Sequence, residues 1–159
     1  MAYAIADEPH ETPWRHLVVH PNAPLLAEML CGTWLALPWF AFNGAAIGSP
    51  TRRKELALCG IQLAVTTVLG ALLLWLVGHH VIESRTIIQL WLLGITTWKL
   101  AIAYTITVVQ GRTFQVYELY GGGVRSPTLV IMLGLVLRDH VFGLFDHPLW
   151  GIIVTGFSP

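Results

Sequence analysis

One long apolar stretch of the chain carries a lysine near its centre. It reads IIQLWLLGITTWKLAIAYTITVV over residues 87–109, and the lysine is Lys99. A bilayer core needs about 20 predominantly apolar residues in a helix, and this stretch is long enough. It lacks the strict alternation of a barrel strand, and only helices and closed barrels satisfy the backbone within a bilayer. The stretch therefore predicts a membrane-spanning helix with a charge at its midpoint.

Three other segments have the same character. They cover residues 25–47, 56–77 and 128–146. The whole chain is 55% hydrophobic and only 11% charged, whereas soluble domains carry about 25% charged residues. We therefore expect an all-α integral membrane protein, with four transmembrane helices in a small bundle that forms one domain over residues 1–159. The lipid bilayer is its first expected partner.

The N-terminus does not have the composition of a signal peptide. Residues 1–22 contain three acidic residues and a single Arg15, the reverse of a positively charged leader. We expect this segment to remain as a tail and the first apolar run to remain as a helix. The net charge of zero and the lack of a basic arm argue against a nucleic-acid partner.

Basic residues in the connections predict the orientation, because cytoplasmic loops carry an excess of Lys and Arg. The first and third connections hold five of them, against Arg15 in the tail and Arg85 in the second connection. This distribution predicts that both termini lie on the extracytoplasmic side of a cell membrane. Residues 110–126 then form a cytoplasmic connection. We expect an ordered loop at 110–126, with a partly helical stretch on the inner leaflet as the alternative. The five residues are Arg52, Arg53, Lys54, Arg112 and Arg125.

Pro148 predicts a break in the fourth helix, because its ring disfavours the α conformation at His147. The apolar tail that follows, residues 148–159, is too short to span a bilayer again. Two arrangements are open for it: the tail continues the bent helix, or it lies in the outer interface.

Three charges lie near the centres of the last two spans: Lys99, Arg138 and Asp139. Counting ~1.5 Å per residue from the helix ends places Lys99 and Asp139 at a common depth near the midplane. Because a lone charge there is costly, we expect Lys99 to pair with Asp139, while Arg138 competes or binds a backbone carbonyl. Such a pair has a function, in moving a proton or ion or in binding a charged headgroup, or it only fixes the register of two helices. We prefer the last interpretation.

A second polar group is expected near the outer surface. Imidazoles and carboxylates together suit transition metals, and two histidines could ligate a haem. However, no fixed metal-binding motif is present, so we expect no cofactor, with haem or a transition metal as the alternative. A pH-sensing role for the same histidines is a further alternative. The residues are Glu28, His79, His80, His140, Asp146 and His147.

Three functions from different classes fit the sequence. The preferred one is a non-enzymatic accessory or assembly subunit, held by the intramembrane ion pair and bound to another membrane protein or a second copy. The second is a small transporter or channel unit that relays protons or ions through Lys99 and Asp139. The third is a haem or metal protein that uses the outer histidines. No nucleotide-binding, hydrolase or metalloprotease motif supports an enzyme.

Overall fold

The computed structural model describes residues 10–155, and this part of the chain is all-helical. The expectation of an all-α fold is confirmed, and two helices, α3 and α4, are long and apolar enough to cross a membrane. The elements are η1 (Arg15–Leu17), α1 (Asn22–Leu30), α2 (Thr33–Ile47), α3 (Arg52–Gly78), α4 (Arg85–Leu119), α5 (Thr128–Phe142) and α6 (Pro148–Thr155).

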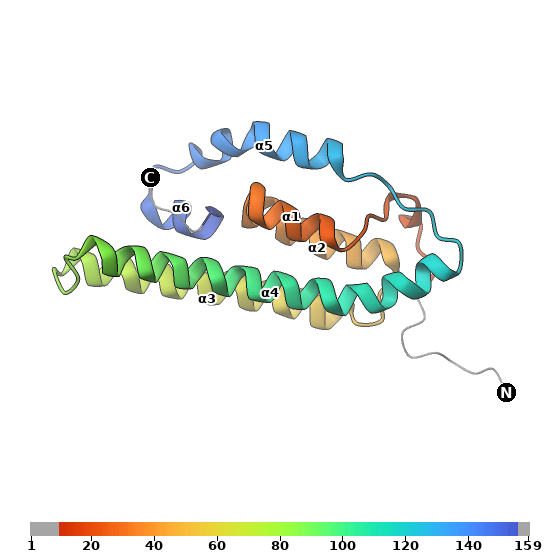
Figure 1. The fold of residues 1–159 in the computed structure, drawn as a ribbon, viewed down its shortest axis with the longest axis horizontal. Helices are drawn as coiled ribbons and strands as arrows, with labels where there is room; N and C mark the ends of the chain where they lie inside the picture. The colour runs from red at the N-terminus through yellow and green to blue at the C-terminus, as the bar shows by residue number, and fades with distance from the viewer. Residues whose placement is uncertain (1–9, 156–159) are drawn as a thin grey trace.

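The long helices α3 and α4 form an antiparallel hairpin that runs the length of the molecule (Figure 1). They contain 27 and 35 residues, which corresponds to about 40 and 52 Å of helix. The predicted spans 56–77 and 87–109 both lie inside them. The hairpin turns at residues 79–84, where His80 adopts a positive φ of 56°.

The predicted span 25–47 is not a single helix, and this is the main correction to the sequence-based fold. The chain breaks between α1 and α2 at Gly32, whose φ is 96° and ψ is 180°. Only glycine adopts this conformation readily. After the break, α2 returns beside α1 (Figure 1), so that the amide of Val19 before α1 donates to Asn43 near the end of α2, at 3.1 Å. Hydropathy does not register the break because both halves are apolar.

The fold-back at Gly32 brings the N-terminal segment 10–21 to the same end of the molecule as the connections 48–51 and 120–127. The amide of His10 donates to the carbonyl of Gly48 at 2.9 Å, and the amide of Arg125 donates to the carbonyl of Val18 at 2.8 Å. For residues 10–21, the expectation that the N-terminal tail lies opposite these connections is therefore wrong; residues 1–9 of that tail lie outside the described residues. We call this end the basic end, and the other, formed by residues 79–84 and 143–147, the hairpin end. The basic end carries Arg15, Arg52, Arg53, Lys54, Arg112 and Arg125.

Helix α4 continues to Leu119, so residues 110–119 are helical rather than part of a loop. The extension is stabilised by burial, because Phe114 and Tyr117 pack in an apolar cluster with Val18, Ala46 and Ile47. The Tyr117 hydroxyl also donates to the carbonyls of Arg15 and Gly123, at 2.9 and 3.0 Å. The connection that remains covers residues 120–127.

A break is present before Pro148, where α6 begins, but the predicted span 128–146 is shorter than expected: α5 has 15 residues and already ends at Phe142. Proline is well tolerated at a first helical position, where its missing N–H has no intrahelical partner. Helix α6 neither continues α5 nor lies at the outer surface. It turns back over α3. There the side chains of Leu149 and Ile152 pack closely against Gly70, in the space that a larger side chain would fill.

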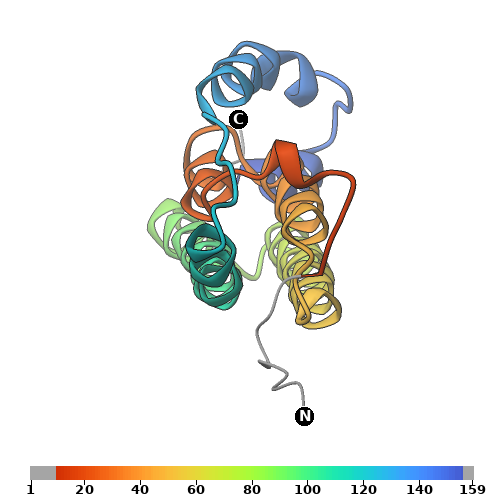
Figure 2. The ribbon, with the colours of Figure 1, turned by 90° about the vertical axis from the view of Figure 1, so that its right-hand side faces the viewer.

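The helices form three layers, which Figures 1 and 2 show from two sides. The hairpin of α3 and α4 is the first layer. The second layer contains α1 over α4, and α2 and α6 one after the other over α3. Helix α5 is the third layer and crosses the α1–α2 turn at Gly134, where an added Cβ would lie 2.9 Å from the Cys31 sulfur.

Candidate functional site

The centre of the molecule holds a buried ion pair between Glu28 of α1 and Lys99 of α4. The Lys99 Nζ lies 3.6 Å from Glu28 Oε1, and the two side chains are only 3% and 1% exposed, in that order. The predicted contact between Lys99 and Asp139 is not formed, because α1 lies between α4 and α5 and Asp139 is exposed. The fold-back at Gly32 brings Glu28 to this depth.

Glu28 Oε1 also accepts two hydrogen bonds. The Thr33 hydroxyl donates to it at 2.7 Å, and the Gln62 Nε2 donates to it at 3.3 Å. Thr33 is the first residue of α2. The carboxylate therefore lies at the N-terminus of a helix that starts inside the molecule, where the helix dipole favours negative charge.

Lys99 also contacts the other helix that ends inside the molecule. Its Nζ donates to the carbonyls of Ile153 and Val154, at 3.1 and 3.4 Å. These carbonyls belong to the last turn of α6, where four carbonyls lack an intrahelical partner and the dipole favours positive charge. The start of α2 and the end of α6 thus meet around the ion pair. We call the resulting group the central polar site: Glu28, Thr33, Gln62, Thr66, Lys99 and the carbonyls of Ile153 and Val154.

Three oxygen atoms of the central polar site are buried and have no hydrogen-bond partner among the described residues. They are Glu28 Oε2, Gln62 Oε1 and Thr66 Oγ1. Thr66 follows Gln62 by one helical turn, so the two side chains leave the same face of α3. An unsatisfied buried polar group costs about 1–3 kcal/mol. Most buried polar groups in native proteins have a partner, which ordered water or a bound ion can supply.

Apolar clusters enclose the central polar site on both sides along the helices. Toward the basic end lie Ala36, Phe40, Cys59, Ala103 and Ile106, which belong to one buried cluster. Toward the hairpin end a second cluster contains Leu73, Leu92, Ile95 and Ile152. The central polar site is therefore occluded from both ends.

A second buried polar cluster lies near the basic end, around Glu55 of α3. Glu55 Oε1 accepts hydrogen bonds from the hydroxyls of Ser49 and Thr51, and Oε2 accepts one from Gln110 Nε2 at 2.9 Å. Gln110 also donates to the Phe40 carbonyl and accepts from Asn43. This cluster joins α2, α3 and α4, and both of its carboxylate oxygens have partners, unlike those of Glu28.

The other predicted charges lie away from the central polar site. Arg138 of α5 donates to the carbonyl of Leu30 at 3.3 Å, and its guanidinium lies 5.9 Å from the Phe142 ring centroid. Leu30 is the last residue of α1, so Arg138 caps a helix C-terminus. His140 is exposed beside Asp139.

The predicted outer cluster does not assemble. His79 and His80 lie in the turn between α3 and α4, where His79 Nδ1 contacts the Trp75 carbonyl and His80 pairs with Glu83. Asp146 and His147 lie in the connection between α5 and α6. Glu28 is buried at the centre instead. Across residues 10–155, no group of three or more His, Cys, Asp or Glu side chains is placed to hold a metal ion.

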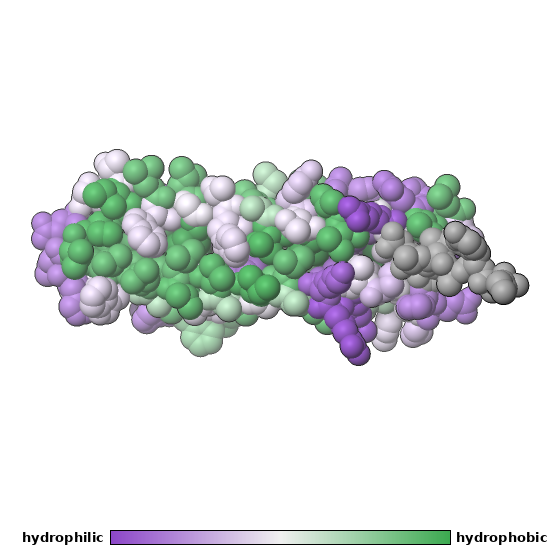
Figure 3. Space-filling view, turned by 90° about the horizontal axis from the view of Figure 1, so that it is seen from below, coloured by the Kyte–Doolittle hydropathy of each residue, from purple (hydrophilic) through white to green (hydrophobic). Residues whose placement is uncertain are grey.

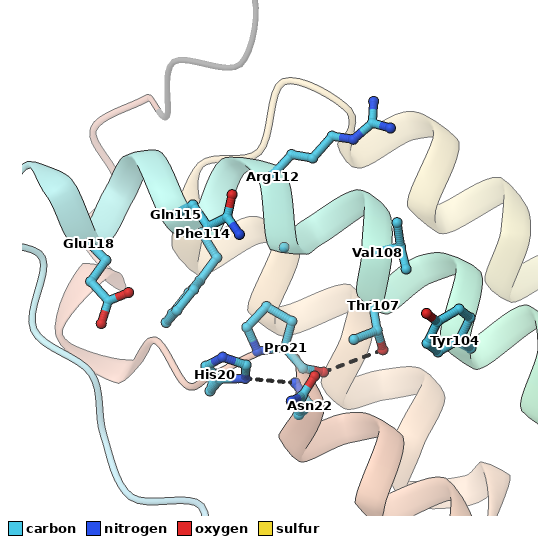
Figure 4. Close-up of a pocket in the computed structure, with 11 residues that line it drawn as sticks. His20, Pro21, Asn22, Tyr104, Thr107, Val108, Arg112, Phe114, Gln115 and Glu118 are labelled. Carbon is cyan, nitrogen blue, oxygen red and sulfur yellow. Dashed lines mark hydrogen bonds between the residues drawn. The ribbon is translucent and has the colours of Figure 1, made fainter.

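A separate cavity of about 510 Å³ opens near the basic end between α4 and the start of α1 (Figure 4). In it, His20 Nδ1 accepts the amide of Asn22, and the Thr107 hydroxyl donates to the Pro21 carbonyl. Arg112 points away from His20 in this view. Neither Glu28 nor Lys99 lines this cavity, so it is distinct from the central polar site.

Sequence reasoning identified Lys99 but missed its surroundings. Gln62 and Thr66 are uncharged, and only their spacing of four in an apolar helix marked them as a polar face. Comparison with known proteins adds no further indication of function, since no family model, curated protein or solved structure matches the chain.

Proposed function

We propose that the chain is a polytopic membrane protein in which α3 and α4 cross the bilayer and the 15-residue α5 lies beside them within it. The core helix of a soluble protein is mostly buried, but only 28% and 33% of the residues are buried in the most apolar windows of α3 and α4. The face made by these helices carries an apolar band between two more hydrophilic ends (Figure 3). In α5, Gly134 is the only buried residue. Such broad apolar exposure is the expected surface of a lipid-facing helix.

In this arrangement, the α1–α2 pair and α6 enter the bilayer from opposite sides and end near its midplane. The basic end faces the cytoplasm, because its six Lys and Arg residues compare with Arg85 alone at the hairpin end. The N-terminal segment 10–21 is then cytoplasmic, and the hairpin end faces the outside of a cell membrane.

We propose that this protein is a small transporter or channel unit that relays protons or ions through the central polar site. The observation that carries the proposal is the meeting of the α2 start and the α6 end at the buried Glu28–Lys99 pair. Interrupted helices whose ends point at a midplane site are typical of ion and substrate sites in transporters. Ionisable residues at this depth mark ion or proton pathways.

In this proposal, the apolar clusters on the two sides of the central polar site act as its gates. Access from the cytoplasm requires the α1–α2 pair to move from α3 and α4, which separates Phe40 from Ala103 and Ile106. Access from outside requires α6 to move, which separates Ile152 from Leu73 and Ile95. Each moving element holds one side of the site: α1 carries Glu28, and α6 carries the carbonyls that bind Lys99.

Proton flux into proteoliposomes tests the proposal, with a trapped pH-sensitive dye as the readout. Glu28→Gln and Lys99→Met are expected to lower the flux at least about tenfold, since each removes one of the two ionisable side chains of the proposed pathway. Asp139→Asn is the matched control, because its carboxylate is exposed, and it should retain the wild-type flux. Lys99→Arg keeps the positive charge and is the variant to measure if Lys99→Met does not fold. Wild-type flux in folded Glu28→Gln protein would overturn the proposal.

An accessory or assembly subunit is the second candidate, and α5 is the observation that favours it. Large apolar side chains of α5 such as Leu129, Met132 and Val136 are exposed at 83%, 60% and 69%. A cavity of about 390 Å³ between α2, α3 and α6, almost entirely apolar, adds a groove for a partner helix. This candidate predicts crosslinks from α5 to another chain and no proton flux in the purified protein.

A further inference from the structure

We infer that the cavity near the basic end binds an aminophospholipid, a lipid whose headgroup joins a phosphate to a primary ammonium. The lipid phosphate lies toward Arg112, its ammonium toward Glu118, and its acyl chains toward Tyr104 and Val108. This inference rests on the proposed membrane placement of α4, and it is independent of the proton relay.

The cavity runs along one face of α4 and changes from apolar to polar along its length. Its volume of about 510 Å³ is within the range of about 300–1,000 Å³ that is usual for small-molecule sites. Toward the centre of α4 it is lined by Tyr104 and Val108, which are 61% and 43% exposed. Toward the basic end it is lined by the exposed side chains of Arg112, Gln115 and Glu118. An amphiphile along this face therefore meets apolar and then charged side chains.

The charged part of the cavity lies at the level where α3 begins. Gln110 Nε2 donates to Glu55 Oε2 at 2.9 Å, so this turn of α4 lies beside the first turn of α3. Arg112 lies about half a turn further along α4, level with the three basic residues 52–54 of α3. In the proposed membrane placement, basic side chains at this level mark the cytoplasmic edge of the bilayer. Arg112 is therefore at the depth of the lipid phosphates.

The order of the two charges along α4 matches the order of groups in an aminophospholipid. Glu118 lies about 9 Å further along the helix axis than Arg112, on the side away from Val108. In the lipid, the phosphate adjoins the acyl chains and the ammonium is the outermost group. Neither Arg112 nor Glu118 takes part in the two ion pairs found within residues 10–155. Both charges are therefore available to a ligand, and a purely anionic headgroup would be repelled by Glu118.

His20 and Gly111 give the cavity its shape. His20 lies on the side of the cavity away from Arg112 (Figure 4), and its ring packs edge-on against Phe114, with 4.9 Å between the ring centroids. Its Nδ1 accepts the amide of Asn22, so that the neutral ring carries its proton on Nε2 and can donate to an oxygen of the lipid. At Gly111 an added Cβ would meet nothing within 4 Å, so the backbone of α4 is open to the cavity.

Native mass spectrometry of the purified full-length protein in detergent tests the two charges. The probes are phosphatidylethanolamine and phosphatidylglycerol with identical acyl chains. Glu118→Gln should weaken binding of the ethanolamine lipid about threefold to fivefold, the effect of one exposed ion pair, without weakening binding of the glycerol lipid. Arg112→Gln should weaken binding of both lipids. Arg53→Gln is the matched control, because Arg53 is exposed at the same level and does not line the cavity. Unchanged affinity of Glu118→Gln for the ethanolamine lipid would overturn the proposal.

A second variant fills the cavity from its floor. Gly111→Leu adds a side chain that begins in open space, so the fold should be retained while the lipid is displaced. Gly94→Leu is the control, because Gly94 is equally open, lies in the same helix and is outside this cavity. The ethanolamine lipid should remain bound in Gly94→Leu and be lost in Gly111→Leu. Undiminished binding in folded Gly111→Leu would rule out this site.

A soluble competitor distinguishes a membrane lipid from a free phosphate ester. Glycerophosphoethanolamine carries the same headgroup without the acyl chains that contact Tyr104 and Val108. It should therefore displace the lipid only at much higher concentration. Displacement at the same concentration as the intact lipid would overturn the assignment to a membrane lipid.

Failure of this inference is distinguishable from failure of the proposed function. Proton flux that depends on Glu28, in a protein whose lipid binding is unaffected by Gly111→Leu, overturns the lipid site and leaves the relay. Lipid binding that is lost in Gly111→Leu, in a protein without proton flux, supports the lipid site and overturns the relay. Full-length protein that is not incorporated into liposomes of any composition overturns the membrane placement itself.

Discussion

Glu28 and Lys99 form a buried pair, 3.6 Å apart, although one lies in a helix of nine residues and the other at the centre of the longest described helix. The pair joins the second layer of the molecule to the first. Lys99 extends the link to α6 through the carbonyls of Ile153 and Val154. One contact therefore holds three elements at the same depth.

Removing both members of this pair should destabilise the protein by less than the sum of the two single removals. Glu28→Gln or Lys99→Met leaves a buried charge without its partner, and such losses amount to about 3–5 kcal/mol. The double variant Glu28→Gln/Lys99→Met leaves no charge behind, so its loss should be smaller than the sum. Thermal unfolding in detergent measures the four proteins of this cycle. Additive losses would contradict the pairing, and Asp139→Asn, exposed on α5, should change the stability by less than about 0.5 kcal/mol.

The sequence predicted the helical class and the two long helices, because apolar runs of this length have few alternatives. It did not predict the partner of Lys99. Hydropathy treats residues 25–47 as one span, and this placed Glu28 near the outer surface. The fold-back depends instead on the backbone of Gly32, which a window average cannot detect. Asp139 was chosen for its depth, but depth does not specify which face of α5 turns toward α4.

The break at Gly32 should depend on glycine itself. Gly32→Ala places a Cβ at a φ of 96° and a ψ of 180°, and such strained conformations cost about 1–3 kcal/mol. The same change should weaken the Thr33–Glu28 hydrogen bond, since Thr33 follows directly. Unfolding midpoints in detergent provide the measurement. Gly94→Ala in α4 is the control, because an added Cβ there meets nothing within 4 Å; an equal loss in both variants would contradict the assigned break.

The crossing of α5 over the α1–α2 turn should depend on Gly134. An added Cβ would lie 2.9 Å from the Cys31 sulfur and closer still to the Leu35 side chain. Gly134→Ala should therefore destabilise the protein by about 1–3 kcal/mol, the usual effect of overpacking. It should also increase the reaction of buried Cys31 with a thiol reagent. Gly143→Ala, where the nearest contact is 3.6 Å, should leave Cys31 protected. Continued protection in folded Gly134→Ala would argue against this packing.

Gln110 should be essential to the buried cluster around Glu55. The side-chain amide of Gln110 forms hydrogen bonds with Glu55, Asn43 and the Phe40 carbonyl at the same time. Gln110→Leu leaves these buried groups without that partner, and each unsatisfied group costs about 1–3 kcal/mol. Denaturant or thermal unfolding should show a loss of several kcal/mol. Gln115→Leu, an exposed position on the same helix, should have little effect. A similar small effect of both substitutions would contradict the hydrogen-bonded cluster.

The position of the N-terminal segment gives the sharpest test of the fold-back. Cysteines introduced as Trp14→Cys, Arg53→Cys and Arg125→Cys lie at the basic end, and one introduced as Glu83→Cys lies at the hairpin end. All four positions are exposed, while the native Cys31 and Cys59 are buried. A membrane-impermeant maleimide should label the first three only in inside-out vesicles and Glu83→Cys only in right-side-out vesicles. Trp14 is the discriminating position, because a single helix over 25–47 would place it on the same side as Glu83. Labelling of Trp14→Cys together with Glu83→Cys would show that the first apolar run crosses the bilayer, and the central polar site could not form as described.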